Sequence, residues 1–395
     1  MAIRAIAAAS LAKGASDIRN PASCDDALAA LAVIRGLGAE VEIASDQWRI
    51  AGGGEPRGTV LDCGESGLAM RLFTAIAGLR DEQVVLTGHG SLASRPMGMI
   101  EGPLRKLGAR VETTQGFLPV RIQGPIRSGR ITVDGSMGSQ LVSGLLFALP
   151  LCEGDSEVTV ENPRSGPYLD LSVEVLGRFG IEIRRNRSPW GFEIPGGQAY
   201  RPESYEVEGD WSGASFLLAA GAMAGKVEVS GLRLDSGQAD RMMIEALRMA
   251  GARVHEGEGK VLVERDQLRG FEIDVTDAPD LFPPLASLAC SCQGETVLHG
   301  LGRLRHKESD RGAALAMELG RMGARVEPCG DALCIQGGPL QGADVGSHDD
   351  HRIAMACAVA ALVAKNETRI LGGECVSKSY PGFFDDLARL GGEIS

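Results

Sequence analysis

Apolar runs with helical spacing recur six times along the chain, and each ends at a glycine followed by a short alternating segment. Glycine directly after a helix readily takes the left-handed backbone conformation that ends many helices. The alternation of β-branched and polar residues in segments such as AEVEI predicts strands. The spacing between successive copies, 68 to 72 residues, predicts six repeats. The capping glycines are Gly38, Gly108, Gly180, Gly251, Gly323 and Gly391.

A second pattern recurs in another phase, in which small or polar residues lead into a strongly apolar helix and then a strand. Its copies start 68 to 74 residues apart, at Gly64, Gly135, Gly209, Asp277 and His348. Each repeat therefore reads strand–helix–strand–helix–strand, which predicts an α/β protein. Six such repeats are too many residues to share one compact hydrophobic core. We expect two domains of three repeats, residues 1–207 and 208–395, divided near Tyr205–Gly209; a continuous solenoid is the alternative.

The first apolar helix, MAIRAIAAASLAKG, begins at Met1 itself. In the phase of the other repeats, a strand and a loop precede this helix. We therefore expect an N-terminal strand and loop to be missing from this sequence.

Composition narrows the class of protein. Hydrophobic residues make up 44% and charged residues 23% of the 395, which is typical of a globular protein. A net charge of −12 and 4% aromatic residues do not suit nucleic-acid binding. The longest apolar run, Ile353 to Ala364, is 12 residues long, and roughly 18 are needed to span a bilayer. We expect neither a nucleic-acid nor a membrane partner.

The nine cysteines are scattered and form no CxxC pair. This usage indicates buried reduced thiols, as is typical of cytoplasmic proteins. The alanine-rich start resembles a secretory signal peptide only weakly, because its apolar stretch is weak and lacks the usual lead-in. We therefore expect a cytoplasmic protein.

The starts of the apolar helices are the positions where chemistry is expected. A helix N-terminus offers unpaired N–H groups and a positive dipole end, which together bind anions. Helix capping explains a single serine there, such as Ser139 or Ser212, equally well. Basic residues gather at similar places, which indicates small ligands with several negative charges, such as phosphates and carboxylates. These residues are Arg4, Arg95, Lys307, Arg311, Arg352 and Lys378; a solvated surface charge is the alternative for each.

Three acidic or imidazole residues allow sharper hypotheses. Asp280 enters an apolar helix, so it is either a helix cap or a carboxylate whose pKa is raised by apolar walls, suited to moving a proton. His348 and His351 have the appearance of metal ligands, but no third ligand stands at a persuasive spacing. We expect no metal site.

Nine motifs spread in order over nearly the whole chain make it resemble the family of 5-enolpyruvylshikimate-3-phosphate (EPSP) synthases. The motifs are GESGLAMR, SRPMG, DGSMGSQ, RSGPYLDLS, EGDWSGAS, DAPD, HKESDR, DDHRIAM and CVSKSYPGFF. The resemblance implies the two-domain enolpyruvyl transferase fold, each domain having three βαβαββ repeats about a pseudo-threefold axis, with the active site in the interdomain cleft. It implies transfer of the enolpyruvyl group of phosphoenolpyruvate to the 5-hydroxyl of shikimate 3-phosphate with release of phosphate, a step of chorismate and aromatic amino acid biosynthesis. The family needs no cofactor, and we expect a monomer.

Site residues carry over from the family motif by motif. The resemblance implies that Asp280 is the base for the 5-hydroxyl, that Glu308 transfers a proton near the methylene carbon, and that His351 lies behind the substrate contacts. It places shikimate 3-phosphate at Arg4, Ser139, Gln140, Ser165, Tyr168, Asp280 and Lys307. It places phosphoenolpyruvate at Gly67, Arg95, Gln140, Arg311, Arg352 and Lys378.

Several positions depart from the family pattern. The family begins its first helix with Gly-Ser-Lys-Ser. This motif is missing here, and only the nearby arginine of the family pattern is present, as Arg4. A truncated chain with weak or no activity is therefore one alternative. Glu65 stands where the family has Asn, and near an anion it is repulsive unless it pairs with an arginine. Gly138 and Gly166 replace a Ser and a Lys.

UDP-N-acetylglucosamine enolpyruvyl transferase is a second alternative, since that family has a similar fold. Its mobile loop carries a cysteine five residues before an Arg-Pro pair. Here Gly90 takes that place before Arg95-Pro96, and residues 88–99 contain no cysteine. The loop therefore argues against this alternative.

Overall fold

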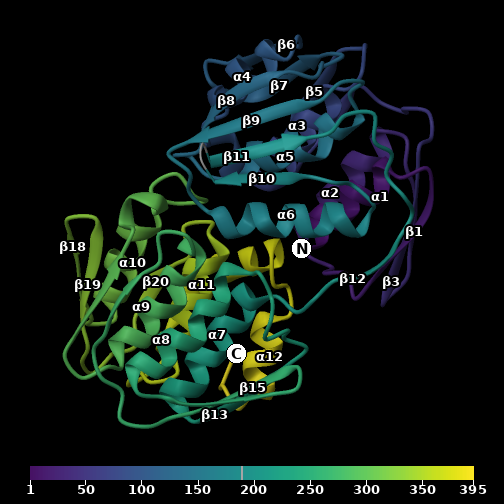
Figure 1. The fold of residues 1–395 in the computed structure, drawn as a ribbon. Coiled ribbons are helices and arrows are strands. Elements are labelled where there is room, and N and C mark those ends of the chain that lie inside the picture. The colour runs from purple at the N-terminus through teal and green to yellow at the C-terminus, as the bar shows by residue number, and fades with distance from the viewer. Residues whose placement is uncertain (188–189) are drawn as a thin grey trace. The chain divides into compact units, whose positions relative to one another are not determined.

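The structure is a computed structural model that describes residues 1–187 and 190–395. The chain divides into two compact units, Met1–Val207 and Glu208–Ser395 (Figure 1). Each unit has its own cluster of buried hydrophobic side chains.

The described part of the N-terminal unit holds three four-stranded sheets, in which one outer strand runs parallel to its neighbour and the other pairings are antiparallel. The outer parallel strand of the first sheet, β12, comes from the end of the third repeat. The strand orders are β12 (Ser204–Glu206), β1 (Gly14–Arg19), β3 (Gln47–Gly52), β2 (Glu40–Ile43); β4 (Val60–Asp62), β5 (Val84–Thr87), β7 (Phe117–Gln123), β6 (Arg110–Thr114); and β8 (Arg130–Asp134), β9 (Ser156–Glu161), β11 (Trp190–Ile194), β10 (Arg184–Arg187).

Helices of two kinds accompany these sheets. The first helix of each repeat is buried over most of its length, because its sequence is apolar on nearly every face. The second helix of each repeat buries one stripe and leaves charged residues exposed. The first helices are α1 (Ala2–Leu11), α3 (Gly67–Ala77) and α5 (Gln140–Ala148), and the second are α2 (Asp25–Gly36), α4 (Glu101–Lys106) and α6 (Gly166–Arg178).

The C-terminal unit repeats the arrangement of helices. Its buried helices α7 (Trp211–Ala224), α9 (Phe282–Cys290) and α11 (His351–Ala361) pack against one another. The outer helices are α8 (Met243–Ala250), α10 (Arg311–Arg321) and α12 (Phe383–Arg389). The described sheets are β13 (Lys226–Ser230), β15 (Lys260–Glu264), β14 (Arg253–Gly257); β16 (Glu272–Asp274), β17 (Glu295–His299), β19 (Ala332–Gln336), β18 (Arg325–Cys329); and β20 (Asp344–Gly346), β21 (Arg369–Leu371). Among these described sheets, only that of β16 to β19 has four strands with one outer parallel strand.

The repeat pattern read from the sequence is confirmed in its main features. All six capping glycines have positive φ angles, between 81° and 107°, and a strand follows each of the five later apolar helices. The strand predicted after the sixth glycine, Gly391, is wrong, because residues 392–395 form no strand. In the other five repeats this strand is one arm of a hairpin.

The expectation of reduced thiols throughout is wrong for Cys329 and Cys334, which form a disulfide across the β18–β19 hairpin. The hairpin brings their Cα atoms to 6.0 Å, a pairing that linear spacing did not reveal. The other cysteines are free thiols. Burial raises the pKa of Cys290, Cys292 and Cys357 to about 12, so these thiols stay protonated near neutral pH.

Among the described residues, no helix is long and apolar enough to cross a membrane.

The capping role of the glycines gives a paired test in α10. Gly323 has φ +91°, whereas Gly320 lies inside the helix with nothing within 4 Å of the place a Cβ would take. We expect Gly323→Ala to destabilise the C-terminal unit by about 1 kcal/mol, because a Cβ disfavours the left-handed conformation. We expect Gly320→Ala to stabilise it by about 0.5–1 kcal/mol. Melting curves measure both, and changes of the same sign would contradict the assignment.

Candidate active site

A buried arginine at the start of α10 is the centre of the polar cluster in the C-terminal unit. The Arg311 side chain is 1% exposed. Its Nε donates to Asp350 Oδ2 at 2.8 Å, its Nη1 to Asp280 Oδ1 at 2.7 Å, and its Nη2 to Glu308 Oε2 at 2.5 Å. Burial alone would lower the pKa of Arg311, but the charges of these carboxylates raise it above its ordinary value. The guanidinium therefore stays charged.

Asp280 lies in the short 3-10 helix η5 (Pro279–Leu281), among three cations. Besides Arg311, its oxygens lie 3.4 Å from Lys307 Nζ and 3.1 Å from Arg352 Nη2. Burial raises the pKa of Asp280, but the charges of Arg352, Lys307 and Arg311 lower it well below its usual range. The expectation of a raised pKa is therefore wrong, because three cations outweigh the apolar surroundings. The capping alternative also fails, since α9 begins without a side-chain cap.

Arg352 joins the N-terminal ends of the three buried helices of this unit. It is the second residue of α11, its Nη2 pairs with Asp280 ahead of α9, and its Nη1 donates to Ser212 Oγ at 2.5 Å in the first turn of α7. Ser212 does not cap α7, because Asp210 does so by accepting from the N–H groups of Ser212 and Gly213. Three helix ends and a guanidinium thus converge, an arrangement that favours an anion.

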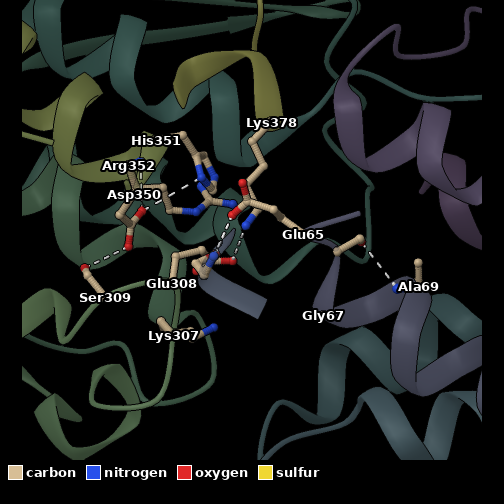
Figure 2. Close-up of polar contacts among 12 residues, drawn as sticks. Glu65, Gly67, Ala69, Lys307, Glu308, Ser309, Asp350, His351, Arg352 and Lys378 are labelled. Carbon is tan, nitrogen blue, oxygen red and sulfur yellow. Dashed lines mark hydrogen bonds and ion pairs between the residues drawn. The ribbon is translucent and has the colours of Figure 1, made fainter. Parts of the chain in front are cut away.

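Glu308 and Lys378 complete the cluster. Lys378 ends the 3-10 helix η7 (Gly373–Lys378), and its Nζ lies 3.8 Å from Glu308 Oε1. Both side chains are largely buried. Figure 2 shows them near Asp350 and Arg352. The structure therefore brings together the predicted residues of this unit: four cations surround the carboxylates of Asp280 and Glu308. Asp350, which was not predicted, joins them.

His351 lies beside this cluster and is almost completely buried. Burial, aided by the charge of Arg352, lowers the pKa of His351 to about 3, so the ring is neutral near neutral pH. Its Nδ1 lies 3.8 Å from Asp350 Oδ1. His348 contacts a different carboxylate, that of Glu318, at 2.7 Å. In the described ranges, no group of three or more His, Cys, Asp or Glu side chains is arranged to hold a metal ion.

In the N-terminal unit, Arg4 links α1 to α6. Its Nε donates to Ser172 Oγ at 2.9 Å and its Nη2 to the Tyr168 carbonyl at 3.2 Å. Burial lowers the pKa of Arg4 to about 10, which still leaves it charged near neutral pH. Ser165 precedes α6 in a left-handed conformation with φ 57° and is buried. The predicted residue Arg4 is thus bonded to α6, whose first turn contains Tyr168 and follows Ser165.

A second group in this unit surrounds the N-terminus of α3. A Cβ at Gly67 would overlap the Arg95 guanidinium and would lie 3.0 Å from Arg71 Nη1. Arg71 Nη1 also donates to Gln140 Oε1 at 2.6 Å, and its Nη2 donates to the Pro96 carbonyl at 3.0 Å. Ser139 precedes α5 and makes no side-chain cap there. The predicted residues Gly67, Arg95, Ser139 and Gln140 are therefore adjacent, with Arg71 between them.

Glu65 has a structural partner. Its Oε2 accepts hydrogen bonds from Ser91 N at 2.9 Å and Ser91 Oγ at 2.8 Å. Ser91 belongs to the 3-10 helix η1 (Gly90–Ser94), which leads directly into Arg95. The carboxylate therefore holds the segment that carries a predicted anion-binding arginine.

The sequence does not single out Asp350 and Arg71 as functional residues, although Arg71 belongs to the motif GESGLAMR and Asp350 to DDHRIAM. Asp350 is completely buried, binds Arg311 through both oxygens and accepts from the Arg352 N–H at 3.0 Å. The signal in the sequence was that each charged residue stands close to predicted site residues. Asp350 contacts Arg311, which is 39 residues away in sequence, and Arg71 contacts Gln140, which is 69 residues away, so the sequence alone does not reveal these pairings.

Known proteins provide an independent comparison. The family model described as EPSP synthase (3-phosphoshikimate 1-carboxyvinyltransferase) matches residues 1–387. A relative from Thermococcus kodakarensis, named 3-phosphoshikimate 1-carboxyvinyltransferase, is 43% identical over 98% of this chain and 94% of its own length. One of the same name from Methanocorpusculum labreanum is 38% identical over 99% and 94%.

Solved structures agree with the sequence comparison. A solved structure of EPSP synthase from Acinetobacter baumannii matches with a TM-score of 0.82 and 30% identity. The match covers 98% of this chain and 92% of that one. With nearly its whole length matched by the family model, by relatives and by a solved structure, the chain belongs to the EPSP synthase family.

Proposed function

We propose that this protein transfers the enolpyruvyl group of phosphoenolpyruvate to the 5-hydroxyl of shikimate 3-phosphate and releases phosphate. The observation that carries the proposal is the cluster around Arg311. There, two carboxylates suited to proton transfer, Asp280 and Glu308, lie among four cations suited to phosphate and carboxylate groups. Membership of the EPSP synthase family supports the assignment of these two substrates.

The residues divide between the two substrates as the family resemblance implies. Shikimate 3-phosphate is assigned to Arg4, Ser139, Gln140, Ser165, Tyr168, Asp280 and Lys307. Phosphoenolpyruvate is assigned to Gly67, Arg95, Gln140, Arg311, Arg352 and Lys378. Both sets draw on the N-terminal and the C-terminal unit, so the proposal requires the two units to share one active site.

The proposed reaction has two steps. The 5-hydroxyl oxygen bonds to C2 of phosphoenolpyruvate as Asp280 takes the hydroxyl proton and a proton is added to the C3 methylene from the side of Glu308. In the second step the C2–O bond to phosphate breaks and C3 returns a proton, which leaves the enolpyruvyl ether and inorganic phosphate. Negative charge gathers around the tetrahedral C2, where preorganised cations stabilise it most effectively.

The charge state of Asp280 fits this sequence once the substrates are included. The same three cations that lower the pKa of Asp280 would bind the incoming phosphate and carboxylate groups. Sharing their positive charge with the substrates raises the pKa of Asp280 toward a range in which it is an effective base. Basicity would thus develop only in the complex with both substrates.

Phosphate release from the two substrates together tests the proposal. We expect release that requires both of them, and we expect none when UDP-N-acetylglucosamine replaces shikimate 3-phosphate as the acceptor. Equal release with either acceptor, or release from phosphoenolpyruvate alone, would contradict it.

Asp280→Ala should reduce kcat by about 10²- to 10⁴-fold, because the 5-hydroxyl proton loses its acceptor. Asp310→Ala is the matched control, since Asp310 caps α10 two residues after Glu308 by accepting from Ala313 N at 3.2 Å. It should cost about 1 kcal/mol of stability and leave turnover per folded molecule nearly unchanged. Steady-state kinetics with a melting curve for each variant separate the two effects. An Asp280→Ala protein with near-normal kcat would show that the base is wrongly assigned.

Gly67→Ala should raise the KM for phosphoenolpyruvate by at least about tenfold, the cost of one displaced charge-assisted contact. The added methyl group would overlap the Arg95 guanidinium and displace it. Gly102→Ala in α4 is the control, because nothing lies within 4 Å of its Cβ position. An unchanged KM in Gly67→Ala would mean that Arg95 does not contact this substrate.

A further inference from the structure

The turn that precedes α11 has a strained backbone. His348 and Asp349 both have φ +54°, in the left-handed region that residues with a Cβ rarely adopt. Two such residues in succession persist only where the surrounding structure holds them, and such strain is concentrated at functional sites. Contacts from neighbouring residues must therefore stabilise the conformation of this turn.

A buried carboxylate from α10 holds this turn. Glu318 is 1% exposed, its Oε1 accepts from His348 Nε2 at 2.7 Å, and its Oε2 accepts from Gly346 N at 3.0 Å. The ring nitrogen is the donor, because an ionised carboxylate only accepts. The Glu318 side chain is thus hydrogen-bonded both to the backbone that enters the turn and to a side chain within the turn.

The turn delivers three side chains to the cluster around Arg311. Immediately after Asp349, Asp350 accepts from the Arg352 N–H at 3.0 Å, from Ser309 Oγ at 3.0 Å and from Arg311. His351 and Arg352 follow in the first turn of α11, as Figure 2 shows. Any rotation of the turn would shift Asp350 relative to Arg311 and Arg352 relative to Asp280.

We propose that Glu318 and His348 are positioning residues for the enolpyruvyl transfer, because their pair holds the left-handed turn that sets Asp350 and Arg352. Neither residue belongs to the cluster around Arg311. The inference rests on the proposed function, since its kinetic consequence is the placement of Arg352 for a substrate anion and of Arg311 beside Asp280.

Two changes at Glu318 test the grip. Glu318→Ala removes both hydrogen bonds to the turn, together with the one that Arg321 Nη1 donates to Glu318 Oε2 at 3.1 Å. It should lower kcat/KM for phosphoenolpyruvate by about 10- to 100-fold, the scale of a small misplacement of reactive groups. Glu318→Gln retains one acceptor oxygen and should lose less. Leu315→Ala in the same helix, whose side chain is completely buried, is the stability control. It should lower the melting temperature without changing kcat/KM per folded molecule.

Relief of the backbone strain provides the decisive variant. Glycine tolerates φ +54° at no steric cost, and no side-chain hydrogen bond of Asp349 is needed for the grip described above. We expect Asp349→Gly alone to leave kcat/KM within about twofold. Added to Glu318→Ala, it should recover at least about threefold, because the turn then needs less support. No recovery, together with a Glu318→Ala defect no larger in kcat/KM than that of Leu315→Ala, would overturn the proposal.

The two proposals fail in different ways. If the unaltered protein does not release phosphate from its two substrates, the proposed function is wrong. Amide hydrogen exchange of residues 346–353 then decides the positioning role without any substrate. It should be faster in Glu318→Ala than in Leu315→Ala and should slow again when Asp349→Gly is added. Equal exchange in the two single variants would overturn the role of Glu318.

Discussion

The burial of one positive charge, that of Arg311, is the constraint on which the polar cluster depends. Removing a guanidinium from water is costly unless hydrogen-bonded counter-charges replace its hydration. Asp350, Asp280 and Glu308 supply them and arrive from three different segments of the C-terminal unit. Each of these segments is therefore held in place by the need to satisfy the same guanidinium.

The cluster is balanced internally before any substrate binds. Asp280 lowers the cost of bringing Arg352 and Lys307 close to Arg311, and these cations in turn keep Asp280 ionised. An anionic substrate competes with Asp280 for the same cations. Under the proposed function, substrate binding and the activation of Asp280 as a base are therefore one electrostatic event.

The buried helices determine where such a cluster can form. Helices α7, α9 and α11 are apolar on nearly every face, so they pack against one another inside the unit. Their N-terminal ends meet at Arg352, which bonds to Ser212 and to Asp280. The strained turn at His348 and Asp349 supplies the third of these ends, and its conformation depends on Glu318 in α10. Core packing and site geometry are therefore set by the same elements.

The sequence by itself determined the repeat length, the helix-capping glycines, most strands and the apolar helices, because these depend on local spacing and on one residue's backbone preference. Only the tertiary structure decided the placement of β12 in the first sheet, the Cys329–Cys334 disulfide, the link from Arg71 to Gln140 and the grip of Asp350 on Arg311. It also decided the direction of the Asp280 pKa shift, which local apolar residues predicted wrongly. Electrostatic and hydrogen-bonding partners come from segments distant in the chain, and their distances, on which the interaction energies depend, exist only in the folded protein.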